Sequence, residues 1–251
     1  MSASSFAQKI AISGAMPRRA APAGKPVNIG FLGPLSGPVQ SWGLPGLNGC
    51  RIWEDWLNMS GGLLLGGRRH PIKIHEFDCG YDPDRARTGA LTLIRDHDVQ
   101  LLMTLGGESL ALVKDELMDQ KILTSTLLPS DLSPDTPYLL APSELHPIFN
   151  VTGVDWLARN RPQYRSVALC AQMDSLGLPS LATYRAAFQA AGISMVQEIQ
   201  YAPAEPDIAA IGDGMLASGA DILCWCTSYT PVVHALTEYV YARGFRGQIL
   251  S

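Results

Sequence analysis

Short apolar runs alternate along the chain with longer amphipathic stretches from residue 27 onward. The runs have the length of strands, and the stretches between them repeat apolar residues at the spacing of one helix face. This alternation is typical of βαβ units around a parallel sheet. We expect strands over 27–32, 71–77, 99–105, 122–127, 166–171, 194–201, 221–226 and 248–250, and helices over 45–58, 82–96, 108–119, 146–160, 178–191, 207–218 and 231–243.

The alternation is interrupted once, by a Pro- and Ser-rich stretch over 129–147. Loops of this composition separate structural units, so we place the first α/β lobe at 27–143 and the second at 144–251. Residues 1–26 are expected to be a disordered leader, because the apolar core of an export signal is missing there. The last strand, 248–250, has no following helix to cover it, which indicates an incomplete second lobe or a fragment.

The first predicted helix has a clear apolar face. Its large residues recur at spacings of three and four, at Leu47, Cys50, Trp53 and Trp56 or Leu57. We expect this face to pack on the sheet while the charged residues between them face water. The next helix has a helix-start signal, because Asp82 precedes Pro83 and Asp is a good N-cap before a Pro in the first turn.

Composition narrows the class of partner. The chain is 47% hydrophobic and 17% charged, as expected for a protein with a well-filled core. Its formal net charge of -4 gives no general attraction to nucleic acids or anionic membranes. The sequence lacks an apolar run long enough to span a bilayer. A small molecule is therefore the expected partner.

Catalytic and metal-binding motifs are absent from the sequence. It has no phosphate-binding P-loop, no H-E-x-x-H and no G-x-S-x-G, and its five histidines are scattered. We therefore expect a protein that is not an enzyme and has no cofactor and no metal. The five cysteines are an odd, irregularly spaced set, best interpreted as buried thiols, with a Cys50–Cys79 bridge as the alternative. Cys224 and Cys226 have no further ligand-spaced partners for a metal.

Several segments resemble one known family. In chain order they are VNIGFLGPLSGPVQSWG, LNG, NMSGGLLLG and FDCGYDP, followed more weakly by DILCWCTSYTPVVHALTEYVYARGFRGQILS. They resemble the branched-chain amino-acid-binding (Leu/Ile/Val-binding) family of ABC transporter periplasmic substrate-binding proteins. The resemblance implies the type 1 periplasmic binding protein fold, in which two Rossmann-like lobes with parallel sheets form a hinged clamshell around the ligand. Family members continue beyond the equivalent of Ser251.

Ligands of open α/β sheets bind in the loops at the carboxyl ends of strands. Three such loops stand out in the first predicted lobe and one in the second. Trp42 can form an apolar wall, glycine at 107 permits close approach, and Ser109 offers a hydroxyl group. Together with the resemblance, these features predict ligand contacts at Ser36, Trp42, Gly107, Ser109, Leu128, Ser130 and Tyr229. Glu108 departs from the hydroxyl residues usual in the family and is expected to cap its helix or contact a cation.

The resemblance implies an extracellular solute-binding protein that delivers an amino acid, or a related small carboxylate or amide, to a membrane ABC permease. The expected compartment is the periplasm. Leu127 and Leu128 make one predicted ligand loop more apolar than in the family, which favours a more hydrophobic ligand. One alternative is a cytoplasmic ligand-sensing regulator on the same fold that acts through a partner protein. A small-molecule enzyme with Asp78 or Glu108 as base is the remaining alternative, and it requires a perturbed carboxylate in a closed pocket.

Overall fold

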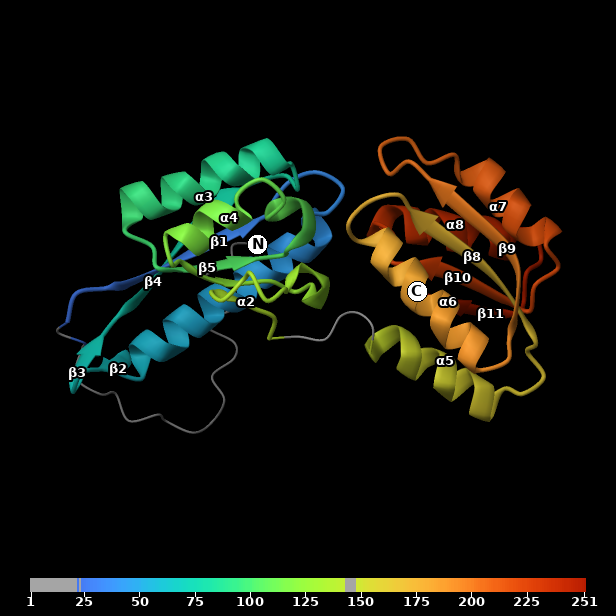
Figure 1. Ribbon diagram of the computed structural model, residues 1–251, viewed down its shortest axis with the longest axis horizontal. Helices are drawn as coiled ribbons and strands as arrows, with labels where there is room; N and C mark the ends of the chain where they lie inside the picture. Colours follow the sequence, from blue (N-terminus) through green and yellow to red (C-terminus); the bar gives the residue numbers. More distant parts are fainter. Residues whose placement is uncertain (1–21, 23, 143–147) are drawn as a thin grey trace.

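The computed structural model describes residue 22 and residues 24–142 and 148–251. They form two α/β lobes that lie side by side, each around its own parallel sheet (Figure 1). The first sheet has the order β4 (Ile72–Asp78), β1 (Val27–Gly33), β5 (Leu101–Thr104), β6 (Leu123–Ser125), β7 (Leu139–Leu140), and the second has the order β11 (Gln248–Leu250), β10 (Ile222–Cys226), β8 (Ser166–Gln172), β9 (Ser194–Tyr201). None of the described strands is shared between these sheets. The change of sheet falls after β7, inside the stretch predicted to separate the lobes.

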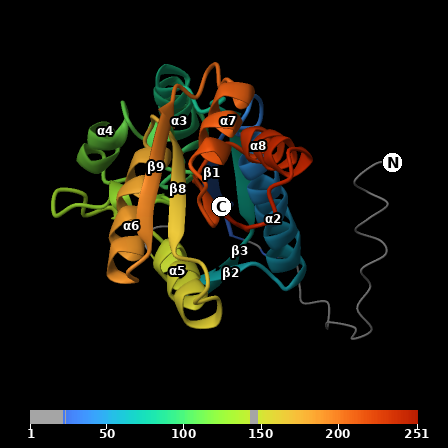
Figure 2. The same cartoon turned by 90° about the vertical axis from the view of Figure 1, so that its right-hand side faces the viewer.

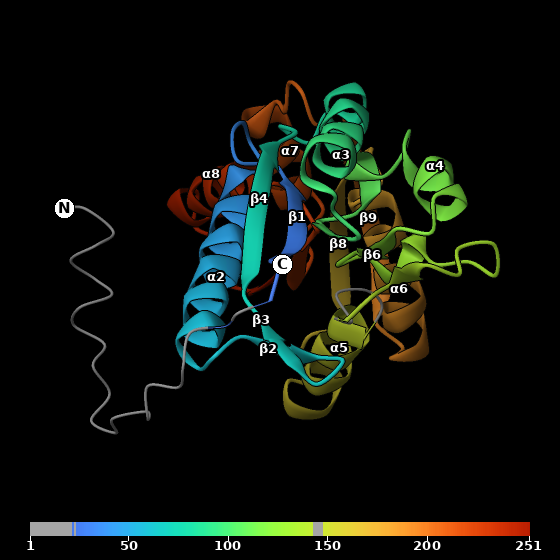
Figure 3. The ribbon, with the colours of Figure 1, turned by 90° about the vertical axis from the view of Figure 1, so that its left-hand side faces the viewer.

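Helices cover both faces of each sheet (Figures 2 and 3). In the first lobe α2 (Gln40–Met59) lies on one face and α3 (Pro83–His97) and α4 (Lys114–Asp119) lie on the other. In the second lobe α5 (Ile148–Asn160) and α6 (Gly177–Ala190) lie opposite α7 (Ile208–Ala217) and α8 (Thr230–Ala242). Two apolar clusters, one on each face, form the core of the second lobe. The predicted α/β fold with parallel sheets is confirmed.

The central strands are apolar on both faces, as parallel strands between two helix layers must be. All five residues of β10 are buried, and Trp225, the fourth of them, is fully enclosed. The start of α3 also follows the predicted signal. The carboxylate of Asp82 accepts a hydrogen bond from the Arg85 amide at 2.8 Å, and Pro83 occupies the first turn.

The first helix differs from its prediction in two ways. It begins at Gln40, five residues before Pro45, so Trp42 lies in its first turn rather than in a loop. Its predicted apolar face is only partly covered, since Trp53 and Trp56 remain 38% and 47% exposed. The reason is its position, because α2 packs on β1 and β4 and leaves β5 to β7 open beside it. An apolar groove of about 590 Å³, lined by Cys50, Trp53 and residues of those strands, results.

Other elements were predicted with the wrong extent. The helix expected over 108–119 is a 3₁₀ turn, η1 (Gly107–Ser109), followed after further turns by the short α4. Backbone bonds between residues three apart, such as Val113 N–H to Leu110 C=O at 3.1 Å, tighten this segment. A second 3₁₀ turn, η2 (Pro129–Asp131), and the short strand β7 lie in the stretch that separates the lobes.

A β-hairpin was missed by the sequence patterns. It pairs β2 (Leu63–Leu65) with β3 (Arg68–His70) in antiparallel register. Gly66 and Gly67 form its turn with φ of 53° and 79°. A Gly-Gly pair between two strand-like runs is a known hairpin signal that could have identified it.

The five cysteines are free thiols, so the alternative of a Cys50–Cys79 bridge is wrong. Four of them are buried, as expected, and Cys50 is half-buried beside Met103. None of the helices in the described ranges is both long and apolar enough to cross a membrane. The predicted leader over 1–26 lies almost entirely outside the described residues.

Candidate functional site

The loops at the carboxyl ends of the strands meet between the two lobes. An apolar cluster joins them, with Val39, Tyr81, Leu105 and Leu128 from the first lobe and Leu176 from the second as its buried members. Trp42 and Leu127 of the first lobe and Tyr229 of the second pack against it. Three of the predicted ligand contacts, Trp42, Leu128 and Tyr229, therefore come together here.

Polar contacts also cross between the lobes. The Thr230 hydroxyl oxygen lies 3.1 Å from the Trp42 indole nitrogen, which donates to it, and 3.0 Å from the Ser41 hydroxyl. On the other side of the cluster, the hydroxyl groups of Tyr81 and Ser175 lie 3.5 Å apart. The two lobes are thus in contact both at the first turn of α2 and at the loop after β4.

Gly107 lies at the contact between the lobes. Its φ of +56° lies in the left-handed region that favours glycine. A Cβ added there would be 2.5 Å from the Tyr81 hydroxyl and 2.7 Å from the Ser175 hydroxyl of the other lobe. Glycine at this position is therefore required both by the turn and by the contact between the lobes.

The amide of Gly107 already has a partner. It donates to the Asp131 carboxylate at 3.0 Å, and the Thr126 hydroxyl donates to the same oxygen at 2.6 Å. The amide at the start of η1 is thus already hydrogen-bonded to the Asp131 carboxylate. The neighbouring Ser130, another predicted contact, is exposed on η2.

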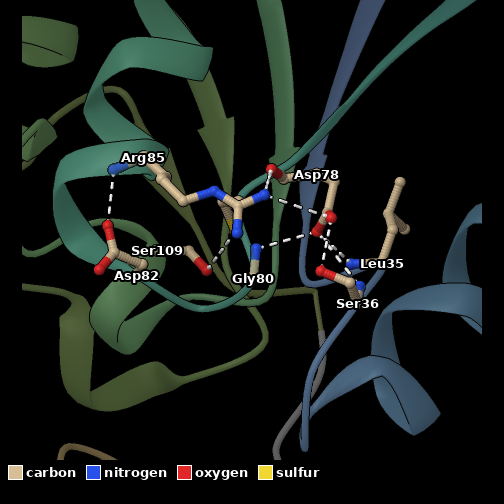
Figure 4. A network of polar contacts seen from close by, with 8 residues as sticks. Leu35, Ser36, Asp78, Gly80, Asp82, Arg85 and Ser109 are labelled. Atoms are coloured by element: carbon tan, nitrogen blue, oxygen red, sulfur yellow. Dashed lines mark hydrogen bonds and ion pairs between the residues drawn. The ribbon is translucent and has the colours of Figure 1, made fainter.

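Asp78 organises the loop between β1 and α2 (Figure 4). Because Gly33 of β1 pairs with Asp78 of β4, the ends of these strands are adjacent. One carboxylate oxygen accepts hydrogen bonds from the amides of Leu35, Ser36 and Gly80, at 2.8, 3.2 and 2.9 Å. The other accepts from the Ser36 hydroxyl at 2.6 Å and from Arg85 at 3.3 Å. The Ser36 hydroxyl, predicted to contact ligand, is thereby engaged within the loop.

These contacts set the charge state of Asp78. Burial by itself raises the pKa of its carboxyl, but the hydrogen bonds from Ser36, Leu35 and Gly80 and the Arg85 guanidinium outweigh burial, so the pKa lies below its usual value. A carboxylate held ionised by this many donors is a poor general base. The role of Asp78 in this structure is to fix a loop.

We expect Asp78→Asn to lower the free energy of unfolding by about 1–2 kcal/mol at neutral pH, because the amides of the loop lose a charged acceptor. A carboxyl group whose pKa is lowered in the folded state stabilises the protein at pH values above its ordinary pKa of 3.8. This stabilisation is lost as the pH falls through the lowered pKa of the folded state. Urea unfolding at about pH 7 and about pH 3 tests both points.

The difference in unfolding free energy between the wild-type protein and Asp78→Asn should shrink at the lower pH. Asp135→Asn, in an exposed loop, is the control and should change little at either pH. A difference that stayed the same at both values would show that the Asp78 charge does not stabilise the fold.

Gln172 fixes the loops of the second lobe. Its side-chain oxygen accepts from the Tyr229 amide at 2.9 Å, and its side-chain nitrogen donates to Asp174 at 2.6 Å. The other oxygen of Asp174 accepts from the amides of Leu176 and Gly177 at the start of α6, at 3.0 and 2.8 Å. The loop after β8 and the loop after β10 are therefore joined by one buried side chain.

The surroundings of Tyr229 are acidic. Burial raises the pKa of its phenol, and the negative charges of Asp174 and of Glu108 from the first lobe raise it further. The Glu108 carboxylate is therefore close enough to the second lobe to act on Tyr229 electrostatically. An anionic ligand group would be repelled at this end of the site.

A cavity of about 380 Å³ lies next to these contacts. Trp42 contributes to it from the first lobe, and the second lobe supplies the ends of β10 and β11 with the adjoining parts of α5, α6 and α8. The remaining lining residues are Phe149, Asn150, Gly153, Tyr184, Thr227, Ser228, Thr230, Val233, Leu250 and Ser251. Three of the walls are aromatic, and within the described part of the chain no lining residue is Asp, Glu, Lys or Arg.

Ser109 lies away from this region. Its side chain is fully buried, and its hydroxyl lies 3.6 Å from the Cys79 thiol. The structure places it in the interior of the first lobe, and its predicted ligand contact stays a prediction, as do those of the other predicted residues. Sequence patterns missed Tyr81, Ser175, Ser228 and Thr230. Thr230 directly precedes Pro231 at the start of a helix that follows a strand, which is a signal that could have identified it.

The fold defines a class of protein, since two parallel α/β lobes that meet at the ends of their strands are the architecture of type 1 periplasmic binding proteins. The sequence profile of the periplasmic binding protein family matches residues 26–250. The chain belongs to this family. No curated protein matches the chain.

Solved structures of solute-binding proteins are similar in fold. One from Rhodopseudomonas palustris, solved with 4-hydroxybenzoate, has a TM-score of 0.74 at 20% identity and is matched over 90% of this chain and 61% of its own. A second from that organism, solved with benzoate, has a TM-score of 0.76 at 16% identity over 89% of this chain and 61% of its own. A Burkholderia mallei periplasmic binding protein has a TM-score of 0.72 at 17% identity over 90% and 60%. The chain thus spans about 60% of the length of these proteins.

Proposed function

We propose that this chain is the ligand-binding part of a periplasmic substrate-binding protein, that it binds a small aromatic carboxylate without turning it over, and that it serves an ABC permease. The observation that carries the proposal is the cavity beside the contact between the lobes. Its volume of about 380 Å³ is within the usual range for small-molecule sites. Trp42, Phe149 and Tyr184 give it the flat apolar walls that a single aromatic ring requires.

The same cavity favours an aromatic acid over an amino acid. A free amino acid carries two charges next to each other, and burying them requires charged or hydrogen-bonding partners for both. An aromatic acid has its charge at one end and can place its ring in the apolar part of the site. Structurally similar proteins from Rhodopseudomonas palustris were solved with benzoate, 4-hydroxybenzoate and 3,4-dihydroxybenzoic acid, which supports this ligand class.

Ligand-dependent melting tests the proposal. We expect benzoate or hydroxybenzoates to raise the melting temperature, because a ligand at about 100 times its Kd stabilises the folded state by about 2.7 kcal/mol. Leucine and phenylalanine should give no shift. The aromatic acid should be recovered unchanged after prolonged incubation. A shift with leucine and none with any aromatic acid would restore the amino-acid hypothesis, and a converted product would identify an enzyme.

Two tryptophan variants locate the binding site. Trp42→Ala removes one wall of the cavity and the hydrogen bond to Thr230, so it should weaken binding by roughly tenfold or more. Trp56→Ala changes a half-exposed residue on the same helix that does not line the cavity, and should leave affinity unchanged. Equal losses in both variants would place the ligand elsewhere.

A further inference from the structure

One hydroxyl group beside the cavity differs from its neighbours in its hydrogen bonding. Ser228 follows β10 and lines the cavity, yet its side chain is only 4% exposed. Its hydroxyl oxygen is buried and has no hydrogen-bond partner of normal geometry in the described part of the chain. The nearby Tyr201 hydroxyl donates to the Gln172 side-chain oxygen at 3.5 Å.

The other polar groups around the cavity are bonded to one another. The Asn150 amide and the Thr227 hydroxyl both donate to the Ser180 hydroxyl, each at 3.0 Å. Thr230 accepts hydrogen bonds from Ser41 and Trp42 of the first lobe. These bonds hold the walls together, whereas no group in the described part of the chain bonds the Ser228 hydroxyl, which retains both its donor and its acceptor.

Leaving a hydroxyl buried without a partner weakens a folded protein. Such a group is retained where it serves function at the expense of stability. A ligand hydroxyl is well suited to satisfy it, because it can both donate and accept. None of the described lining residues has a charged side chain, which matches this arrangement, since a neutral phenol group is far less costly to bury than a carboxylate.

We propose that Ser228 recognises a ring hydroxyl of the bound ligand, so that the site selects hydroxylated aromatic carboxylates over those without a hydroxyl. This inference rests on the proposed function. The ring lies between the aromatic walls with its phenol end directed to Ser228. The carboxylate stays at the mouth of the cavity, where water solvates it. A site built to bond a ligand hydroxyl rejects the analogue that lacks it, because its own buried group then remains unpaired.

Calorimetric titration of 4-hydroxybenzoate and benzoate, each into the wild-type protein and Ser228→Ala, tests the inference. The wild-type protein should bind 4-hydroxybenzoate on the order of tenfold more tightly than benzoate. Ser228→Ala should lose this preference through weaker binding of 4-hydroxybenzoate, while its affinity for benzoate is unchanged. Ser228→Thr keeps the hydroxyl and should retain the preference. Ser194→Ala, at an exposed position of β9, is the control and should bind as the wild-type protein does.

Melting of the ligand-free proteins gives an independent readout. Removing a hydroxyl that has no partner should leave the melting temperature of Ser228→Ala equal to or above that of the wild-type protein. A clear decrease would show that Ser228 is bonded within the protein and would overturn the inference.

The outcomes separate this inference from the proposed function. If the wild-type protein binds both acids equally well, or if Ser228→Ala keeps the preference, the role of Ser228 is wrong while the aromatic-acid site stands. If the wild-type protein binds neither acid nor any other aromatic carboxylate, the proposed function fails and the inference fails with it.

Discussion

Gly107→Ala should reduce the affinity for an aromatic acid on the order of 100-fold. The added Cβ would lie 2.5 Å from the Tyr81 hydroxyl and 2.7 Å from Ser175 of the other lobe, so the two lobes could not meet as they do here. Apparent affinity falls in proportion to the population of the binding-competent state, which we take to be the state with the lobes in contact. A reduction of that population to about 1% gives this loss. Titration calorimetry with 4-hydroxybenzoate measures it directly.

Gly192→Ala is the matched control for this experiment. Gly192 also has a positive φ, +69°, so alanine brings a similar backbone strain, but a Cβ there would meet nothing within 4 Å. It should lower the melting temperature by a few degrees and leave affinity unchanged. If both variants lost affinity equally, backbone strain rather than the contact between the lobes would explain the effect of Gly107→Ala.

Trp225→Ala should lower the free energy of unfolding by about 3–5 kcal/mol, as expected for the loss of a fully buried tryptophan. Trp225 is completely enclosed between β8 and the helices α7 and α8, and its indole N–H donates to Thr237 at 3.1 Å. Removing the ring leaves a large cavity and takes away the donor that the Thr237 hydroxyl accepts from. Urea unfolding followed by circular dichroism measures the loss against a total stability of about 5–15 kcal/mol for an ordinary domain.

Trp156→Ala provides the comparison. Trp156 is 52% exposed on α5, so its replacement should change the free energy of unfolding by less than about 1 kcal/mol. A loss for Trp225→Ala no greater than that for Trp156→Ala would mean that the core of the second lobe does not depend on this ring.

Most of the second lobe was predictable because its elements combine strong patterns with clear ends. The strand over 194–201 agrees with β9 at both boundaries, and the central strand over 221–226 is nearly as close to β10. Short strand-like runs bounded by Gly, Asp or Pro leave few alternatives. The first lobe was less predictable where tertiary contacts override local preference. Pro45 was interpreted as a helix start, but it is accommodated inside α2.

The site was predictable only in part. Strand-end rules correctly brought Trp42, Leu128 and Tyr229 together, because topology decides where the ends of parallel strands lie. They could not show that Ser36 is bonded to Asp78 or that Gly107 is bonded to Asp131, since those partners are distant in sequence. They also could not reveal Ser228, because burial without a partner is a property of the folded structure alone.

The buried side chain of Gln172 has a mechanical consequence. Because it bonds the Tyr229 amide on one side and Asp174 on the other, the loops that follow β8 and β10 are held together. Their conformational freedom is lost when the protein folds rather than when the ligand arrives, which lowers the entropic cost of binding. The loops of the second lobe therefore form a preorganised part of the proposed site.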